Sequence, residues 1–151
     1  MKYIILLLLT AFTFVACESD SSQPDDQNRQ TEVSASIFGI NWILTELNGE
    51  PVSEVETSES IPTIQFDESE NRLYGRGGCN QYNGGFELDA ESGEADFSQI
   101  AATKMACPDM DLENLYFSML NEVERMEQSS QILKFYNSSG ETIALFESME
   151  N

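Results

Sequence analysis

The sequence predicts a mainly β fold, an antiparallel sheet or barrel of short strands with one amphipathic helix before the last two strands. Three observations lead to this fold class. Short runs of alternating apolar residues recur along the chain, turn-forming residues separate them, and residues 109–126 have helical apolar spacing. Short antiparallel strands joined by tight turns are typical of sandwiches and barrels.

The strands are expected in the order in which the turns divide them. Residues 42–47 (WILTEL) alternate and stop at Asn48-Gly49, a strong hairpin turn pair. Acidic, Asn, Ser and Gly residues then separate three further pairs of short apolar runs, each of which predicts a hairpin. The paired runs are 63–66 with 72–75, 86–88 with 95–97, and 132–136 with 142–146.

Residues 109–126 break the strand pattern. Their apolar residues recur at steps of about three and four, as on one face of a helix. Asp109 or Asp111 is expected to cap this helix, whose apolar face should pack on the sheet. The residues on that face are Leu112, Leu115, Tyr116, Met119, Leu120, Val123 and Met126.

The chain opens with MKYIILLLLTAFTFVAC, an apolar run after Lys2 that ends at Cys17. The run is shorter than the roughly 20 residues that span a bilayer and fits the apolar region of a secretory signal. A small residue directly before a cysteine resembles the lipidation signal of bacterial lipoproteins. We therefore expect a signal peptide at 1–16 and lipid on Cys17. The alternative is an ordinary signal cleavage, with Cys17 incidental.

Residues 17–36 are expected to form a lipidated, acidic and disordered tether, and residues 37–148 a single folded domain. The full chain has 27 acidic and 7 basic residues and a net charge of −20. Such a charge opposes binding to nucleic acid and to anionic headgroups, so acyl chains must supply membrane attachment. The predicted location is the cell envelope, at the outer membrane, facing the periplasm or the surface.

The residue types argue against an enzyme. Histidine is absent, which removes Ser-His and Cys-His nucleophile pairs and His-ligated metals. The glycines of residues 75–85 lack the Gly-Lys-Ser/Thr end of a phosphate loop, and residues 109–120 lack the Gly and Glu of a calcium loop. We expect no catalytic residue, metal or cofactor. A pair of carboxylates acting as a hydrolase remains the alternative.

Three cysteines are present. If Cys17 carries lipid, Cys79 and Cys107 form an even pair, which in an exported chain favours a disulfide. That bridge would stabilise the fold by roughly 3.5 kcal/mol through chain entropy. The alternative is that Cys79 and Cys107 are two buried free thiols.

The chain resembles the META domain family. The resemblance depends on GRGGCNQY at 75–82 and IAATKMAC at 100–107, in this order, and covers about residues 38–147. It implies a partly open barrel of lipocalin-like topology crossed by one helix, in an envelope protein loosely linked to stress tolerance. It supplies no activity, ligand or agreed functional residues. Lys104 stands where arginine is common in the family.

The predicted function is a lipid-anchored, non-catalytic envelope module that contacts another envelope protein or exported chain. Asn80, Tyr82 and Lys104 border the predicted bridge, are expected to be exposed, and are the candidate partner contacts. Their structural alternatives are a turn former, an aromatic at the core edge and a surface cation. A second hypothesis is a barrel that binds a small apolar ligand.

Overall fold

A computed structural model describes residues 37–52, 61–107 and 110–149 of the chain. The predicted signal peptide, Cys17 and the tether lie outside these residues. In the described ranges, no helix is long and apolar enough to cross a membrane.

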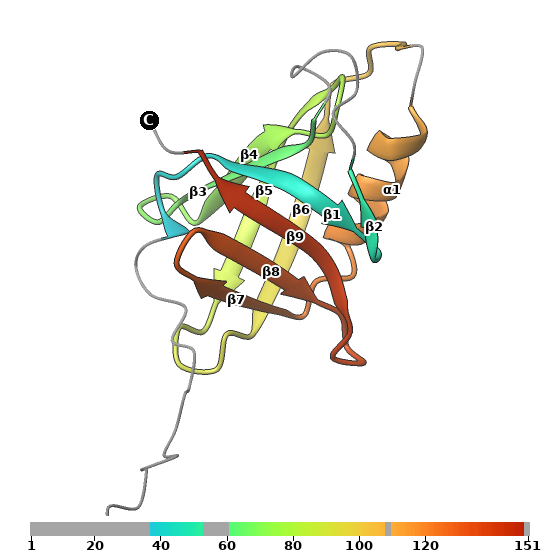
Figure 1. The fold of residues 1–151 in the computed structure, drawn as a ribbon. Helices are drawn as coiled ribbons and strands as arrows, with labels where there is room; N and C mark the ends of the chain where they lie inside the picture. Colours follow the sequence, from blue (N-terminus) through green and yellow to red (C-terminus); the bar gives the residue numbers. More distant parts are fainter. Residues whose placement is uncertain (1–36, 53–60, 108–109, 150–151) are drawn as a thin grey trace, which may run out of the picture.

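The predicted strands and helix follow one another in the predicted order, but two strands that were not predicted, β2 and β7, are added, so three strands and not two follow the helix (Figure 1). The helix, α1, is the only one in the described ranges and lies between the sixth and seventh strands. The strands are β1 (Trp42–Leu47), β2 (Glu50–Pro51), β3 (Thr63–Asp67), β4 (Arg72–Arg76), β5 (Gln81–Leu88), β6 (Ala95–Ala102), β7 (Arg125–Ser129), β8 (Ile132–Tyr136) and β9 (Thr142–Ser148), and α1 is Asp111–Leu120.

The strands form one antiparallel sheet in the order β6-β5-β4-β3-β1-β9-β8-β7, with β2 paired to β1. The sheet curls into a half-barrel, and its two outer strands meet at one end (Figure 1). There the amide of Ala95 donates to the Glu124 carbonyl at 3.0 Å, and the amide of Met126 donates to the Gly93 carbonyl at 2.8 Å. The predicted mainly β, partly open barrel with one helix is confirmed.

The predicted turns form where the sequence places them. Asn48 and Gly49 both have positive φ, 51° and 81°, as the tight turn between β1 and β2 requires. The hairpins β3–β4 and β8–β9 pair in antiparallel register, as does β5–β6. Both β5 and β6 are longer than predicted, because their apolar alternation gives way to Gly84-Gly85 and Ala101-Ala102, which still pair in the sheet.

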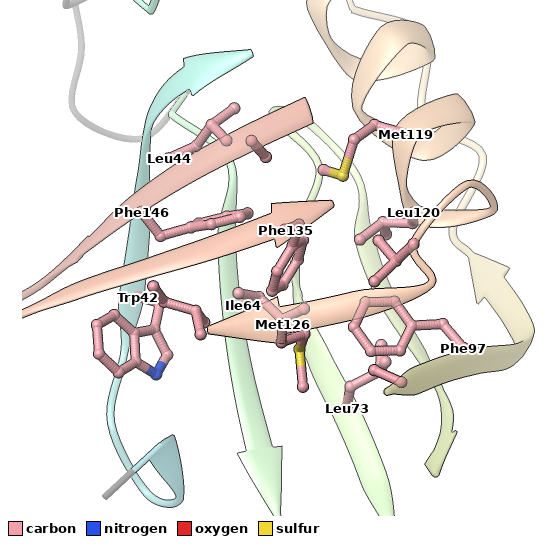
Figure 2. Packing of buried hydrophobic residues seen from close by; sticks show 14 of the residues in the cluster. Trp42, Leu44, Ile64, Leu73, Phe97, Met119, Leu120, Met126, Phe135 and Phe146 are labelled. Atoms are coloured by element: carbon pink, nitrogen blue, oxygen red, sulfur yellow. The ribbon is translucent and has the colours of Figure 1, made fainter. Parts of the chain in front are cut away.

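The interior of the half-barrel is filled by side chains (Figure 2). Phe135 contacts Phe97 and Phe146, with ring centroids 5.5 and 4.8 Å apart. Trp42 is fully buried and its indole Nε1 donates to the Ile37 carbonyl at 3.1 Å. Burial of these large apolar side chains supplies most of the driving force for folding.

The helix departs from the prediction at both ends. It ends at Leu120: Asn121 is the C-cap residue, and its side-chain amide donates to the Phe117 carbonyl at 2.6 Å. Met126 is buried as a residue of β7, not of the helix. Capping by Asp111 is wrong: Met110 occupies the N-cap position without a side-chain hydrogen bond. Asp109 lies outside the described residues.

Leu115 is also misassigned by the helical spacing. Its side chain is 53% exposed, whereas Tyr116, Met119 and Leu120 are buried. The buried face of α1 is narrower than the apolar stripe, since the helix packs against a curved sheet with one side only.

Two leucines of α1 provide a matched stability test. Leu120→Ala should lower the free energy of unfolding by about 2–5 kcal/mol, because it leaves a cavity among buried side chains. Leu115→Ala makes the same chemical change at an exposed site and should cost no more than about 0.5 kcal/mol. Urea unfolding of both variants measures the difference. Equal losses would contradict the packing of α1 described here.

Candidate functional site

The two signature segments of the sequence meet beside the N-terminal end of α1. Cys79, in the turn before β5, forms a disulfide with Cys107, which lies shortly before α1. Their Cα atoms are 6.3 Å apart and 28 residues separate them in sequence. The structure thus contains the predicted bridge, which ties the glycine-rich turn to the segment that leads into the helix.

Asn80 is the centre of this region and is only 2% exposed. The expectation that it is an exposed contact residue is therefore wrong. Its side-chain oxygen accepts hydrogen bonds from the Thr103 hydroxyl at 2.8 Å and from the Met105 amide at 2.7 Å. Its side-chain nitrogen also lies 3.3 Å from the Met105 carbonyl. One amide side chain thereby holds the irregular segment after β6.

Glu113 completes the arrangement from the helix side. It is 2% exposed, and both of its carboxylate oxygens accept hydrogen bonds from Asn80. One oxygen accepts from the Asn80 backbone amide and the other from its side-chain nitrogen, each at 2.6 Å. Glu113 is the third residue of α1, where the positive end of the helix dipole favours a carboxylate. The local sequence does not predict its burial, since it shows only an acid in the first turn of a helix.

Tyr82 is 3% exposed, so the expectation of an exposed contact residue is wrong here too. Its hydroxyl lies 2.6 Å from that of Tyr116, and both hydroxyls bond to the Thr63 carbonyl. Burial raises the pKa of both tyrosines, and contact with Tyr116 raises that of Tyr82 further. These rings connect β5 and the helix to the start of β3.

Gly77 and Gly75 allow the close approach of these elements. A Cβ added at Gly77 would lie 2.5 Å from the Phe117 ring, and one at Gly75 would lie 2.0 Å from the Thr63 carbonyl oxygen. Gly77, opposite α1, and Gly75, opposite β3, are therefore needed for packing. This role agrees with the absence of a phosphate-loop motif in residues 75–85.

The buried polar groups of this region are used in internal hydrogen bonds. Within the described residues, every buried side-chain nitrogen or oxygen has a hydrogen-bond partner. The same ranges hold no group of three or more Cys, Asp or Glu residues arranged to bind a metal. Of the three candidate contact residues only Lys104 is exposed. The others cannot present their side chains to a partner in this structure.

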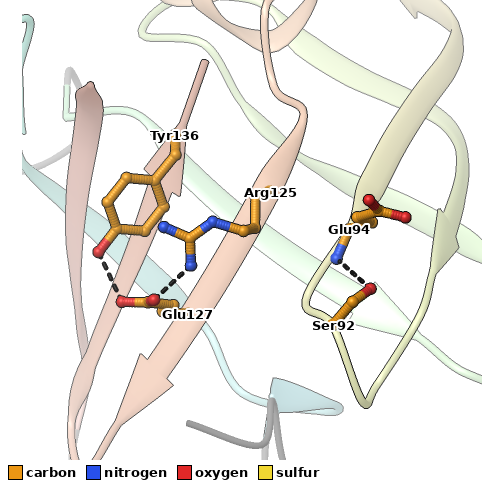
Figure 3. Close-up of polar contacts among 5 residues, drawn as sticks. All are labelled: Ser92, Glu94, Arg125, Glu127 and Tyr136. Atoms are coloured by element: carbon orange, nitrogen blue, oxygen red, sulfur yellow. Dashed lines mark hydrogen bonds and ion pairs between the residues drawn. The ribbon is translucent and has the colours of Figure 1, made fainter. Parts of the chain in front are cut away.

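A separate open cleft of about 840 Å³ lies at the seam where β6 meets β7. On its wall Arg125 pairs with Glu127 and lies 3.9 Å from the ring centroid of Tyr136 (Figure 3). The Tyr136 hydroxyl and Arg125 lower the pKa of Glu127 against the opposing effect of burial. On the other side of the seam, in the turn between β5 and β6, the Glu94 amide donates to the Ser92 hydroxyl at 3.2 Å.

Five carboxylates line this cleft, which bears on the hydrolase alternative. They are Glu87, Asp89, Glu94, Asp96 and Glu124.

All five are exposed, whereas a carboxyl that acts as a general acid near neutral pH needs a buried site. The backbone amides of Ser92 and Glu91 bond to Asp89, lower its pKa and make it a turn former. Nothing in this geometry singles out an acid–base pair.

The half-barrel with its single helix has the architecture that the resemblance to the META domain family implies. A disulfide lies beside its glycine-rich turn. The profile of the META domain matches residues 35–150. The chain belongs to the META domain family. No curated protein matches it significantly.

Solved structures of low sequence identity share the fold. An NMR structure of a protein from Burkholderia xenovorans is 19% identical, with a TM-score of 0.59, and the match covers 77% of this chain and 86% of that one. A second NMR structure is 23% identical, with a TM-score of 0.56 and coverage of 74% and 91%. A crystal structure of a DUF4847 family protein from Bacteroides vulgatus is 16% identical, with a TM-score of 0.55 and coverage of 76% and 96%.

Exchanging the amide and the carboxylate between positions 80 and 113 tests the contact between Asn80 and Glu113. Asn80→Asp sets two carboxylates against each other in a buried site and removes a donor, so unfolding free energy should fall by about 3 kcal/mol or more. Adding Glu113→Gln restores a donor opposite the new carboxylate and returns the net charge to that of the natural chain. The double variant should recover at least about 1 kcal/mol in urea unfolding. Additive losses would contradict the contact.

The tyrosine pair predicts a loss of stability in alkali. Because the folded state raises both pKa values above the unfolded value of 10.0, their contribution is complete below pH 10 and declines as pH rises further. Together they should contribute a slope of about −2.7 kcal/mol per pH unit there, and Tyr82→Phe should halve it.

Unfolding between about pH 10 and 12 measures this slope. Tyr74→Phe, at a ring that is 41% exposed, is the control and should leave the slope unchanged. An unchanged slope in Tyr82→Phe would contradict the buried pair.

Proposed function

We propose that this META-domain protein is a lipid-anchored, non-catalytic module of the cell envelope that contacts another envelope protein or exported chain under stress. The anchor would be acyl chains on Cys17, and residues 18–36 would hold the domain off the membrane. The envelope location and the stress role follow from the lipoprotein-like N-terminus and the family resemblance.

The observation that carries the proposal is the disulfide between Cys79 and Cys107. Disulfides persist in oxidising compartments and are rare in the cytosol, which supports an exported chain. Because Cys79 and Cys107 pair with each other, this bridge does not use Cys17, which is consistent with lipid attachment there.

Support for a non-catalytic role comes from the use of the signature residues. Asn80, Glu113, Tyr82 and Tyr116 are all buried and all bonded to one another or to the backbone. Residues committed to internal contacts in this way stabilise a scaffold. A scaffold of this kind can display exposed side chains such as Lys104 to a partner.

The alternative of an apolar-ligand barrel has less support. The space that a ligand would occupy contains Phe97, Phe135, Phe146 and their buried neighbours (Figure 2). Binding an apolar molecule there would require these rings to move, at a cost of several kcal/mol of core packing.

Palmitate labelling in a bacterial host with lipoprotein processing tests the anchor. The natural chain should incorporate labelled palmitate and sediment with membranes, and Cys17→Ser should lose both properties. Cys79→Ser is the control: it opens the Cys79–Cys107 disulfide but leaves Cys17 in place, and it should keep the label. Label absent from the natural chain, or retained in Cys17→Ser, would contradict the anchor.

The partner contact needs its own experiment. Crosslinking in intact cells under envelope stress should return a reproducible envelope or exported protein, and removal of the Lys104 amine by Lys104→Gln should weaken its recovery. Crosslinking that returns no reproducible partner under stress would count against an interaction role while leaving the anchor in place.

A further inference from the structure

The outer face of β4, β5 and β6 carries a second, shallow hollow, away from the seam. Its volume is about 450 Å³, within the range of small-ligand sites. The residues that line it are Tyr74, Gln81, Tyr82, Asn83, Ala101, Ala102 and Thr103.

The strand register arranges these residues in rows. Tyr74 is opposite Asn83, which is opposite Ala101, and two pairs further along β4 Arg76 is opposite Gln81. Ala101 has a small side chain, which leaves space above this part of the sheet. The ring of Tyr74, which is 41% exposed, lines the hollow beside it. An exposed aromatic ring beside two carboxamides on a rigid sheet is a preorganised surface.

Arg72 lies beside the hollow and contacts one of the residues that line it. Its guanidinium donates to the side-chain oxygen of Asn83, which leaves the Asn83 nitrogen as the group that can donate to a ligand. The nearest acid in register, Asp67, is bonded instead to the amides and hydroxyl of its own turn at Ser69 and Glu70. The guanidinium of Arg72 therefore lies next to the hollow, at its lining residue Asn83.

The charge distribution also favours this face. The chain has a net charge of −20 and only seven basic residues, of which Lys2 and Arg29 precede the described domain. Of the remaining five, Arg72 and Arg76 stand on β4, and Lys104 directly follows Thr103 at the rim. The exposed acids of the same face, Glu87 and Asp96, stand opposite each other further along β5 and β6, so an anionic ligand would be directed to the end that carries the hollow.

We propose that this hollow binds an acidic saccharide, a pyranose unit that carries a carboxylate. The apolar face of the sugar ring would stack on Tyr74, the carboxamides of Gln81 and Asn83 would bond its hydroxyls, and Arg72 would bind the carboxylate. An acidic peptide would use the guanidinium groups but would have no need of the ring and paired amides. The inference goes beyond the proposed function and does not depend on the lipid anchor, so each can fail alone.

Calorimetric titration of the full chain with an oligogalacturonate tests the site, with the neutral oligogalactose of equal length as the comparison ligand. The acidic oligomer should bind at least about tenfold more tightly than the neutral one, and Arg72→Gln or Tyr74→Ala should each weaken it by at least about tenfold. Tyr74→Phe keeps the ring and should retain binding. Lys134→Gln removes a charge from β8 and should change affinity by less than about twofold.

Several results would overturn the proposal. They are no heat of binding at millimolar acidic oligomer, equal affinity for the neutral oligomer, or no effect of Tyr74→Ala. Equally tight binding of a polyglutamate peptide would assign the face to acidic chains in general and reject a saccharide site. Both variants change exposed side chains, and thermal unfolding verifies that each remains folded.

Discussion

The two hydrogen bonds between Asn80 and Glu113 are the constraint on which the rest of this domain depends. They join the turn before β5 to the first turn of α1, 33 residues later in the chain. The same Asn80 side chain holds the segment after β6 through Thr103 and Met105. A buried carboxylate is costly unless it is bonded, so the pair also specifies where the helix must dock. The neighbouring disulfide restrains the same two segments covalently.

This arrangement divides the side chains of the domain into buried ones that hold its elements together and exposed ones that face solvent. The signature glycines, Asn80 and Tyr82 serve the inside, where they bring α1 against the open part of the half-barrel. The outer face of β4 to β6 shares the same strands, because alternate residues of a strand point to opposite faces. Tyr82 is buried, while its neighbours Gln81 and Asn83 stand on the exposed face. A rigid interior therefore positions the exposed groups without further support.

Much of the fold was predictable because local chemistry determines it. Asn48-Gly49 requires the positive φ values of a tight turn, and short alternating runs form hairpins whatever surrounds them. The disulfide followed from the number of cysteines. The end of α1 and the strand β7 did not follow, since apolar steps of three continue through Val123 and Met126, and only the cap at Asn121 interrupts them. The burial of Asn80 and Glu113 was hidden for a different reason. A polar side chain in a turn, as at Asn80, or in the first turn of a helix, as at Glu113, is exposed unless a distant partner reaches it, and no local pattern reveals that partner.

Amide hydrogen exchange at Met105 measures the central contact most directly. Met105 lies outside any strand or helix and its side chain is 56% exposed, so its amide would exchange rapidly if Asn80 did not accept its hydrogen bond. We predict that the Met105 amide exchanges only on global unfolding, with a free energy of opening of about 5 kcal/mol or more. The backbone amide of its exposed neighbour Lys104 should exchange freely. Rapid exchange at Met105 in a domain whose barrel strands remain protected would contradict the account.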